Sequence, residues 1–246
     1  MAQIKGLSGS TLKIIAVILM LIDHTFYAIF DKVYIGRRLP MSGLYFQDGY
    51  LNYEHWIFDL ERLMRSTIGR MAFPIFCFLL VQGFIHTSSK SKYKLRLFAF
   101  ALLSEIPFSL AFRDRLAFGT YNVFFTLLLG FLSLEMIQKD WHPVFRGLAV
   151  GGIALLANAL GCDYGASGIL LIVMLYFAKH DKVMTVLVGL FAILALPAIS
   201  VMSILAYIPI YFYNGERGLN LKYVFYAFYP VHLLILYFVR CAMVGG

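Results

Sequence analysis

Residues 12–30 read LKIIAVILMLIDHTFYAIF, an apolar run that is interrupted near its end by Asp23 and His24. A bilayer core of about 30 Å requires about 20 mostly apolar residues in one helix, so this run is predicted to span a membrane. It lacks a small-residue cleavage site and carries two ionisable residues near its end. Both features predict a retained helix rather than a signal peptide.

Eight further apolar runs follow along the chain, each continuous in the way that membrane helices are. They occupy residues 67–86, 96–112, 121–138, 145–160, 166–178, 183–198, 200–213 and 223–243. Because residues 166–178 and 200–213 are short for a span, we expect a re-entrant or broken helix among them. The predicted fold is all-α integral membrane: a polytopic bundle of about nine transmembrane helices in a single domain, residues 1–246.

The amino-acid composition agrees with a membrane protein. Hydrophobic residues make up 61% of the chain and charged residues 14%, whereas soluble domains average about 45–50% and about 25%. The formal net charge of +8 is expected at the membrane edges, where it suits anionic headgroups or phosphates better than nucleic acid. Cys77, Cys162 and Cys241 are too far apart for a CxxC site or a disulfide framework, and no metal is predicted.

Basic residues predict the orientation, because cytoplasmic loops carry an excess of Lys and Arg. The cluster formed by Lys90, Lys92, Lys94 and Arg96 decides it and places the N-terminus inside. An odd number of spans then places the C-terminus outside.

The long connection at residues 31–66 carries a separate amphipathic pattern. Its apolar face holds Trp56, Ile57, Leu60, Leu63 and Met64, and its charged residues fall on the opposite face. This pattern predicts an amphipathic helix on the outer leaflet, within the first long loop. A surface helix packed on the bundle explains the pattern equally well.

Ionisable side chains inside apolar runs are candidates for a functional site, because burying them in a membrane is costly. The strongest candidates are Asp23, His24, Arg70 and Glu105. His24 lies about 18 Å along its helix from Leu12, in the outer half of the bilayer. Adjacent helix positions point about 100° apart, so the carboxylate that orients His24 is expected from another helix. A helix–helix hydrogen bond is the simpler interpretation of these residues.

Arg70 precedes the Pro74 kink and needs an anion from the protein or from a ligand, unless its side chain reaches the outer headgroups. Glu105 is followed by a second kink at Pro107. It either pairs with Arg70 or orients His24, and the sequence leaves both open.

Other features are weaker signals. Asn122 and residues 163–165 are typical of helix contacts and turns. His232 is either a second ligand-facing histidine or a packing residue near the start of the last helix. The spacing of Gly147 and Gly151 predicts a close helix crossing without chemistry.

These residue types suit two different functions. A neutral histidine can take a proton from a hydroxyl or an amine, and an arginine can stabilise a developing oxyanion. Basic inner loops can hold the phosphates of a nucleotide-bearing donor, so acyl transfer from an acyl-coenzyme A is one reading. A proton-coupled transporter uses buried Asp, Glu and His equally well. Composition and spacing do not choose between the two.

Ten short motifs occur together and in order in one known family. They are LKIIA (12–16), MLIDH (20–24), IGRMAFPIF (68–76), QGFIHT (82–87), YKLRL (93–97), SEIPF (104–108), NVFFT (122–126), DYG (163–165), YNG (213–215) and FYPVH (228–232). On these motifs, which extend over nearly the whole chain, the sequence resembles the TraX family.

The resemblance implies a multi-pass protein of the bacterial inner membrane, of a type linked to conjugative transfer, whose namesake N-acetylates the amino terminus of pilin. It also implies kinship with transmembrane acyltransferases that move acetyl groups from cytosolic acetyl-coenzyme A to acceptors across the membrane. A membrane histidine and arginines are important in that group. The resemblance therefore implies His24 as general base and Arg70 as electrostatic partner, and our own argument adds Asp23 and Glu105 as orienting carboxylates.

The main hypothesis is a membrane acetyltransferase with acetyl-coenzyme A as donor and an extracytoplasmic amine or hydroxyl acceptor on a protein N-terminus, a glycan or a lipid-linked sugar. Expected partners are membrane lipids, acyl-coenzyme A and the acceptor, without nucleic acid, and homo-oligomerisation is left open. The alternatives are a proton-coupled transporter of a small anionic or lipid-linked solute and a non-catalytic assembly factor for a pilus or secretion complex. Coenzyme phosphates are assigned to Lys90, Lys94, Arg96, Arg217 and Lys222, and secondary substrate contacts to Arg65, Asn122, Tyr229 and His232.

Overall fold

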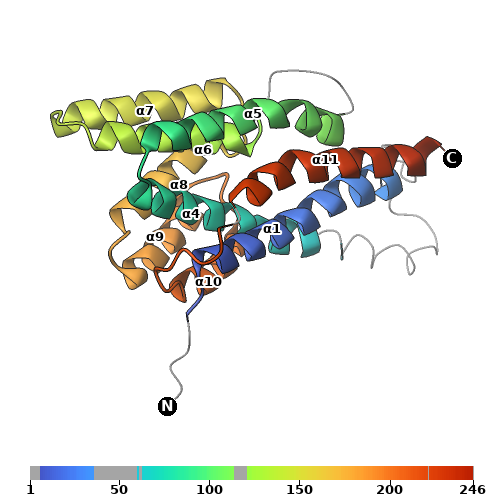
Figure 1. Cartoon of the computed structure of the whole chain (residues 1–246), viewed down its shortest axis with the longest axis horizontal. Helices are drawn as coiled ribbons and strands as arrows, with labels where there is room; N and C mark the ends of the chain where they lie inside the picture. Colours follow the sequence, from blue (N-terminus) through green and yellow to red (C-terminus); the bar gives the residue numbers. More distant parts are fainter. Residues whose placement is uncertain (1–5, 36–59, 61–62, 114–120, 221, 246) are drawn as a thin grey trace, which may run out of the picture.

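The computed structural model describes residues 6–35, 60, 63–113, 121–220 and 222–245. Within these ranges the regular structure is helical, apart from one isolated bridge between Leu7 and Tyr213. The all-α prediction is therefore confirmed for the described residues. Figure 1 shows a helical bundle in which α11 runs alongside α5 and α1.

Each of the nine predicted apolar runs corresponds to one helical element or to two or three consecutive ones. In chain order the elements are α1 (Gly9–Thr25), η1 (Phe26–Ile35), η2 (Met64–Ile68), η3 (Gly69–Met71), α4 (Ala72–His86), α5 (Lys90–Arg113), α6 (Val123–Ile137), α7 (Pro143–Ala159), α8 (Gly165–Phe177), α9 (Lys182–Ala195), η4 (Val201–Ala206), α10 (Tyr207–Tyr211) and α11 (Lys222–Gly245).

Four helical stretches are long and apolar enough to cross a membrane: Gly9–Phe30, Gly69–His86, Lys90–Arg113 and Tyr223–Val244. The apolar helices α6 to α9 and the η4–α10 pair are shorter than such a span. A membrane protein is thus supported, and the count of about nine spans stays a prediction.

Three local features refine the sequence-based picture. α5 begins at Lys90, so the basic cluster of residues 90–96 lies on the first turns of a helix and not in a loop. Residues 200–213 form the broken element that we expected, a 3-10 helix followed by the five-residue α10, whereas α8 is unbroken.

The predicted amphipathic helix of the connection at residues 31–66 falls almost entirely outside the described residues. At the start of that connection, η1 continues α1 as a π-helix.

α4 lies at the centre of the bundle. Its sequence is apolar on every face, which is typical of a helix that is buried all round. It contacts α1, α6, α8 and η4, and ten of its fifteen residues are buried. Because η2 and η3 lead directly into α4, this central helix also fixes the position of Arg70.

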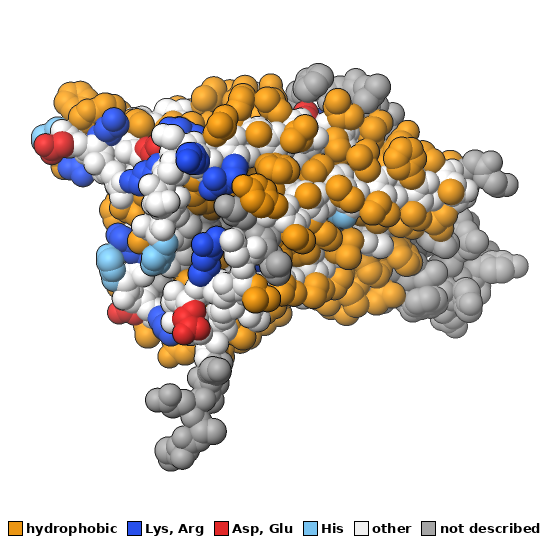
Figure 2. Space-filling view, in the orientation of Figure 1, with side chains coloured by type: hydrophobic (Ala, Val, Ile, Leu, Met, Phe, Trp, Pro, Cys, Tyr) orange, Lys and Arg blue, Asp and Glu red, His pale blue; other side chains and the backbone are white. Residues whose placement is uncertain are grey.

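The outer surface of the bundle is apolar. Leu148 and Leu155 on α7 are 66% and 71% exposed, and Leu194 on α9 is 87% exposed. Figure 2 shows hydrophobic side chains covering most of the visible face away from the basic end, as expected for contact with lipid tails. The close helix crossing predicted at Gly147 and Gly151 is wrong for the described chain, because no other atom lies within 4 Å of a Cβ built at either glycine.

A polar loop at residues 213–219 holds the start of α1. Its carbonyl groups accept hydrogen bonds from two orphan N–H groups of the helix, Glu216 from Gly9 at 2.7 Å and Arg217 from Ser10 at 3.0 Å. Gly218 has a φ of 69° and its Cα lies so close to Ser8 and Ser10 that a side chain would not fit. The loop therefore fixes α1 beside the segment that enters α11, so that both helices start from the same end of the bundle.

At the other end, α11 supports the end of α5. The Arg240 guanidinium donates to the carbonyl of Ala111 at 2.5 Å and to that of Leu110 at 2.8 Å. Both carbonyls belong to the last turn of α5, where the carbonyl groups have no N–H partner within the helix and the helix dipole favours a cation.

Arg240→Leu is expected to lower the free energy of unfolding by about 1–3 kcal/mol, because two buried carbonyls lose a charged donor. Arg240→Lys keeps the charge at the helix end and should lose less. The unfolding midpoint of the detergent-solubilised protein measures both effects. An Arg240→Leu variant as stable as the original protein would contradict the assigned role.

Candidate functional site

A cavity of about 330 Å³ lies at the end of the bundle opposite the basic cluster of α5. It is formed by the end of α1 and the start of η1, by η2 and η3, by the starts of α4 and α6, by the end of α5, by the turn before α8 and by α11. Its wall includes the apolar side chains Phe73, Phe76, Phe108 and Phe112. The polar and charged residues of the lining are Asp23, His24, Tyr27, Arg65, Arg70, Arg113, Asp163, Tyr164 and Tyr229.

His24 lies in this wall between two partners. Its Nδ1 atom is 2.7 Å from Nε2 of His232 on α11, and its Nε2 atom is 3.9 Å from Oδ2 of Asp23. The second distance is too long for a direct hydrogen bond but allows charge interaction. Among the described residues, the carboxylate beside His24 is that of the neighbouring Asp23, and the other helix supplies an imidazole. The expected carboxylate from another helix is not found in this part of the chain.

Asp23 is also in close contact with the backbone of η3. A Cβ atom at Gly69 would overlap the Asp23 carboxyl group, so this glycine allows η3 to approach α1 at the cavity wall. The sequence therefore places Gly69 where the Asp23 carboxylate and the following Arg70 share one cavity.

Arg70 faces a group of ionisable side chains. Asp23, Asp163 and Tyr164 all act on its guanidinium electrostatically. Tyr164 has a φ of 63°, a left-handed conformation that is uncommon for a residue other than glycine. Its ring lies parallel to Phe73 with centroids 3.6 Å apart. Two carboxylates and a tyrosine of the protein thus lie near enough to interact electrostatically with Arg70, and the guanidinium lines the cavity.

Glu105 takes neither of the roles that the sequence suggested. Its Oε2 atom accepts from the Asn122 side chain at 2.9 Å and from the Asn122 backbone N–H at 3.4 Å. Asn122 also donates to Ala101 at 2.8 Å and caps α6 by accepting from the N–H of Phe124. Glu105 and Asn122 thus join α5 to α6 in the core, outside the cavity lining.

The secondary residues divide between the cavity and its support. Arg65 and Tyr229 line the cavity, and the Arg65 guanidinium lies 4.7 Å from the centroid of the Tyr27 ring. The Tyr229 ring meets the His24 ring edge-on at 6.0 Å. His232 lies behind His24 and is absent from the lining.

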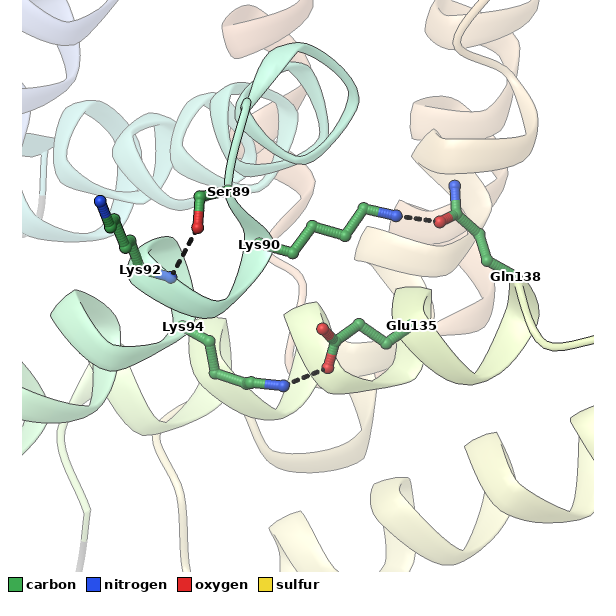
Figure 3. A network of polar contacts seen from close by, with 6 residues as sticks. All are labelled: Ser89, Lys90, Lys92, Lys94, Glu135 and Gln138. Carbon is green, nitrogen blue, oxygen red and sulfur yellow. Dashed lines mark hydrogen bonds and ion pairs between the residues drawn. The ribbon is translucent and has the colours of Figure 1, made fainter.

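Two of the residues assigned to coenzyme phosphates have protein partners at the basic end. Figure 3 shows Lys94 paired with Glu135 of α6 at 2.7 Å and Lys90 donating to Gln138. A phosphate would have to compete with Glu135 for Lys94. These two lysines therefore serve at least to hold α5 against α6.

The other three assigned residues lie nearer to α11. Arg96 lies over the ring of Tyr93 at 5.5 Å, and Arg217 donates to Asn220 at 2.7 Å. Lys222 begins α11, and its side chain falls outside the description. Figure 2 shows Lys and Arg side chains gathered at the end of the molecule where α1 begins.

Sequence reasoning missed part of the cavity. Tyr27 and Arg113 lie near helix ends, where tyrosine and arginine are common at the membrane interface, so the sequence did not single them out. Asp163 and Tyr164 were assigned to a turn, which is correct, but the turn also contributes to the cavity. The motif DYG indicated a turn, but it did not show that Tyr164 adopts a left-handed backbone conformation.

The comparison with known families settles the kinship of the chain. A family model described as "TraX protein" matches residues 8–240. The chain belongs to the TraX family.

One curated relative of this TraX-family chain is described as "Probable fimbrial assembly protein FimC, serogroup H1", from Dichelobacter nodosus. It is 28% identical over an alignment 256 residues long, which covers 93% of this chain and 94% of the relative. No solved structure matches the chain.

The fold brings separate TraX motifs together at one site. The motifs at residues 20–24, 68–76 and 163–165 supply Asp23 and His24, Arg70, and Asp163 with Tyr164 to the cavity lining. The motif at residues 228–232 supplies Tyr229 to the lining and His232 to the back of His24. Segments this far apart in sequence converge on one cavity, which marks it as the candidate site.

Proposed function

We propose that this TraX-family protein is a membrane-embedded acetyltransferase that moves an acetyl group from acetyl-coenzyme A to an amine or hydroxyl acceptor. The observation that carries the proposal is the cavity in which His24, Asp23 and Arg70 meet. A base, a carboxylate beside it and a cation that line one cavity are the parts that acyl transfer requires.

In the proposed reaction, His24 Nε2 takes the proton of the acceptor while the acceptor atom attacks the thioester carbonyl carbon. Asp23, at 3.9 Å from that nitrogen, stabilises the imidazolium that forms. Arg70 stabilises the negative charge on the carbonyl oxygen in the tetrahedral intermediate. The carbon–sulfur bond then breaks, the coenzyme thiolate takes the proton from His24, and the acetylated acceptor leaves.

The two ends of the bundle have complementary roles in this proposal. We infer that the basic end faces the cytoplasm of a bacterial cell, because cytoplasmic segments are rich in Lys and Arg. The coenzyme phosphates would bind there, near Arg96, Arg217 and Lys222. Lys90 and Lys94 could also bind a phosphate if they released Gln138 and Glu135. The pantetheine arm would extend along the bundle to the cavity, where the acceptor arrives from the other side.

The direct test uses purified full-length protein in liposomes with radiolabelled acetyl-coenzyme A. Saturable coenzyme binding and label transfer to added pilin, glycan or lipid-linked sugar acceptors are the expected results. Protein that binds no acetyl-coenzyme A and transfers no label in the presence of these acceptors would overturn the proposal.

Gly69→Ala is expected to reduce acetyl transfer by about 10²-fold, because a methyl group at this position displaces Asp23 and a small misplacement is costly in catalysis. Gly151→Ala is the matched control, since its Cβ meets no other atom within 4 Å. The transfer assay measures both variants. Equal rates for the two variants would show that the contact between Gly69 and Asp23 does not matter.

The second candidate function is a non-catalytic assembly factor, which the description of the FimC relative as a probable fimbrial assembly protein favours. This reading predicts normal fimbrial or pilus assembly in cells that carry His24→Gln, and loss of assembly on changes at the exposed loops. The acetyltransferase predicts that His24→Gln cells lose one acetyl group from an envelope component.

A further inference from the structure

His232 on α11 contacts His24 in an arrangement that fixes more than packing. The two rings are nearly parallel, with an interplanar angle of 6° and centroids 5.0 Å apart. Their facing nitrogens are 2.7 Å apart, which is shorter than the centroid separation by about two ring radii. Both nitrogens therefore lie close to the line between the ring centres, and the two parallel rings lie nearly in one plane. An N–H of one ring therefore points directly at the in-plane lone pair of the other.

The direction of this hydrogen bond follows from a third group. His232 Nδ1 lies 2.8 Å from the carbonyl oxygen of Phe228, one turn earlier in α11. A carbonyl oxygen can only accept, so His232 Nδ1 carries the proton. In a neutral ring the other nitrogen, Nε2, is then bare and accepts from His24 Nδ1.

The same reasoning continues to the second nitrogen of His24. With Nδ1 protonated, neutral His24 has a bare Nε2, and this atom lies on the side of Asp23. Imidazole in water prefers the opposite tautomer, with the proton on Nε2. The chain from Phe228 through His232 therefore selects the form of His24 that can accept a proton from an acceptor.

His232 is well suited to this task because burial and a contact with Phe228 fix the orientation of its ring. It is 4% exposed, and it lies parallel to Phe228 with centroids 4.6 Å apart. Its ring is absent from the cavity lining, so it does not touch a substrate there.

We propose that His232 is a positioning residue that fixes His24 in the tautomer with a bare Nε2. The importance of this tautomer for catalysis rests on the proposed acetyl transfer. The tautomer itself can be measured without any assay of activity.

The test is ¹⁵N NMR of the full-length protein in nanodiscs with ¹⁵N-labelled histidine, at an alkaline pH where both rings are neutral. Protonated and bare ring nitrogens resonate far apart, and His24→Gln and His232→Gln assign the signals by their loss. The expected result is a protonated Nδ1 and a bare Nε2 for both histidines. A His24 ring with a protonated Nε2 and a bare Nδ1 would overturn the proposal.

Two substitutions test the dependence on His232. The side-chain oxygen in His232→Gln can still accept from His24 Nδ1 and should preserve the tautomer, whereas His232→Leu offers no acceptor and should shift His24 to the solution form. In the transfer assay, His232→Leu is expected to lose about 10²- to 10⁴-fold, with at least tenfold rescue by Gln. An unchanged tautomer in the Leu variant would contradict the role of His232.

The spectra and the assay separate the two proposals. The expected tautomer in a protein that transfers no acetyl group would refute the proposed function and leave the positioning of His24 intact. Acetyl transfer by a protein with the opposite tautomer would refute the positioning and leave the function intact.

Discussion

Acetyl transfer by the His24→Gln variant is expected to fall by about 10²- to 10⁴-fold, the range that a positioned general base contributes. Glutamine keeps hydrogen-bonding capacity toward His232 but cannot take a proton from the acceptor. The loss should therefore appear in kcat, while coenzyme binding at the basic end of the bundle persists. The measurement is the rate of label transfer in liposomes at saturating acetyl-coenzyme A.

The matched control for His24 is His86→Gln. His86 lies at the end of α4, is exposed, and bonds to the backbone of Gln82 at 2.9 Å, far from the cavity. This variant should transfer acetyl groups at the original rate. If His24→Gln retained a rate close to that of His86→Gln, His24 would not be the general base.

Arg70→Met is expected to lower kcat by about 10²- to 10³-fold, the cost of removing one donor to an oxyanion. The guanidinium also interacts electrostatically with Asp23 and Asp163, so its removal takes a compensating positive charge away from both carboxylates. Arg70→Lys keeps the charge but not the planar fork and should recover part of the rate. The measurement is kcat and KM for acetyl-coenzyme A, with the change expected in kcat.

Arg146→Gln is the control for Arg70. Arg146 lies at the opposite end of the bundle, where it donates to the carbonyls of Trp141 and Ile137. Its loss should leave kcat unchanged. Full activity of Arg70→Met would exclude Arg70 from the reaction and leave its contacts with Asp23 and Asp163 as structural.

The fold was largely predictable because each apolar run carries its own signal. Run length and continuity depend on consecutive residues, so the positions of α1, α4 and α11 follow from the sequence. The start of α5 at Lys90 was missed because basic residues in the first turns reduce the apolar signal without preventing a helix. Glycine spacing at Gly147 and Gly151 was a weaker guide, since it does not say which face of a helix has a neighbour.

The sequence predicted which residues belong to the site better than it predicted which side chains contact one another. Asp23, His24 and Arg70 stand out because a charge inside an apolar run is costly. The partner of Glu105 is Asn122, and that of His24 is His232, and both pairs depend on how distant helices pack. Tyr164 depends on a left-handed turn that only the fold reveals.

The central claim is acetyl transfer that depends on His24. Mass spectrometry of pilins, glycans and lipids from cells with the protein, without it, and with His24→Gln tests this claim most directly. We predict one envelope component whose mass is greater by one acetyl group in the first cells alone. Identical masses in all three strains, or an acetyl group that survives His24→Gln, would contradict it.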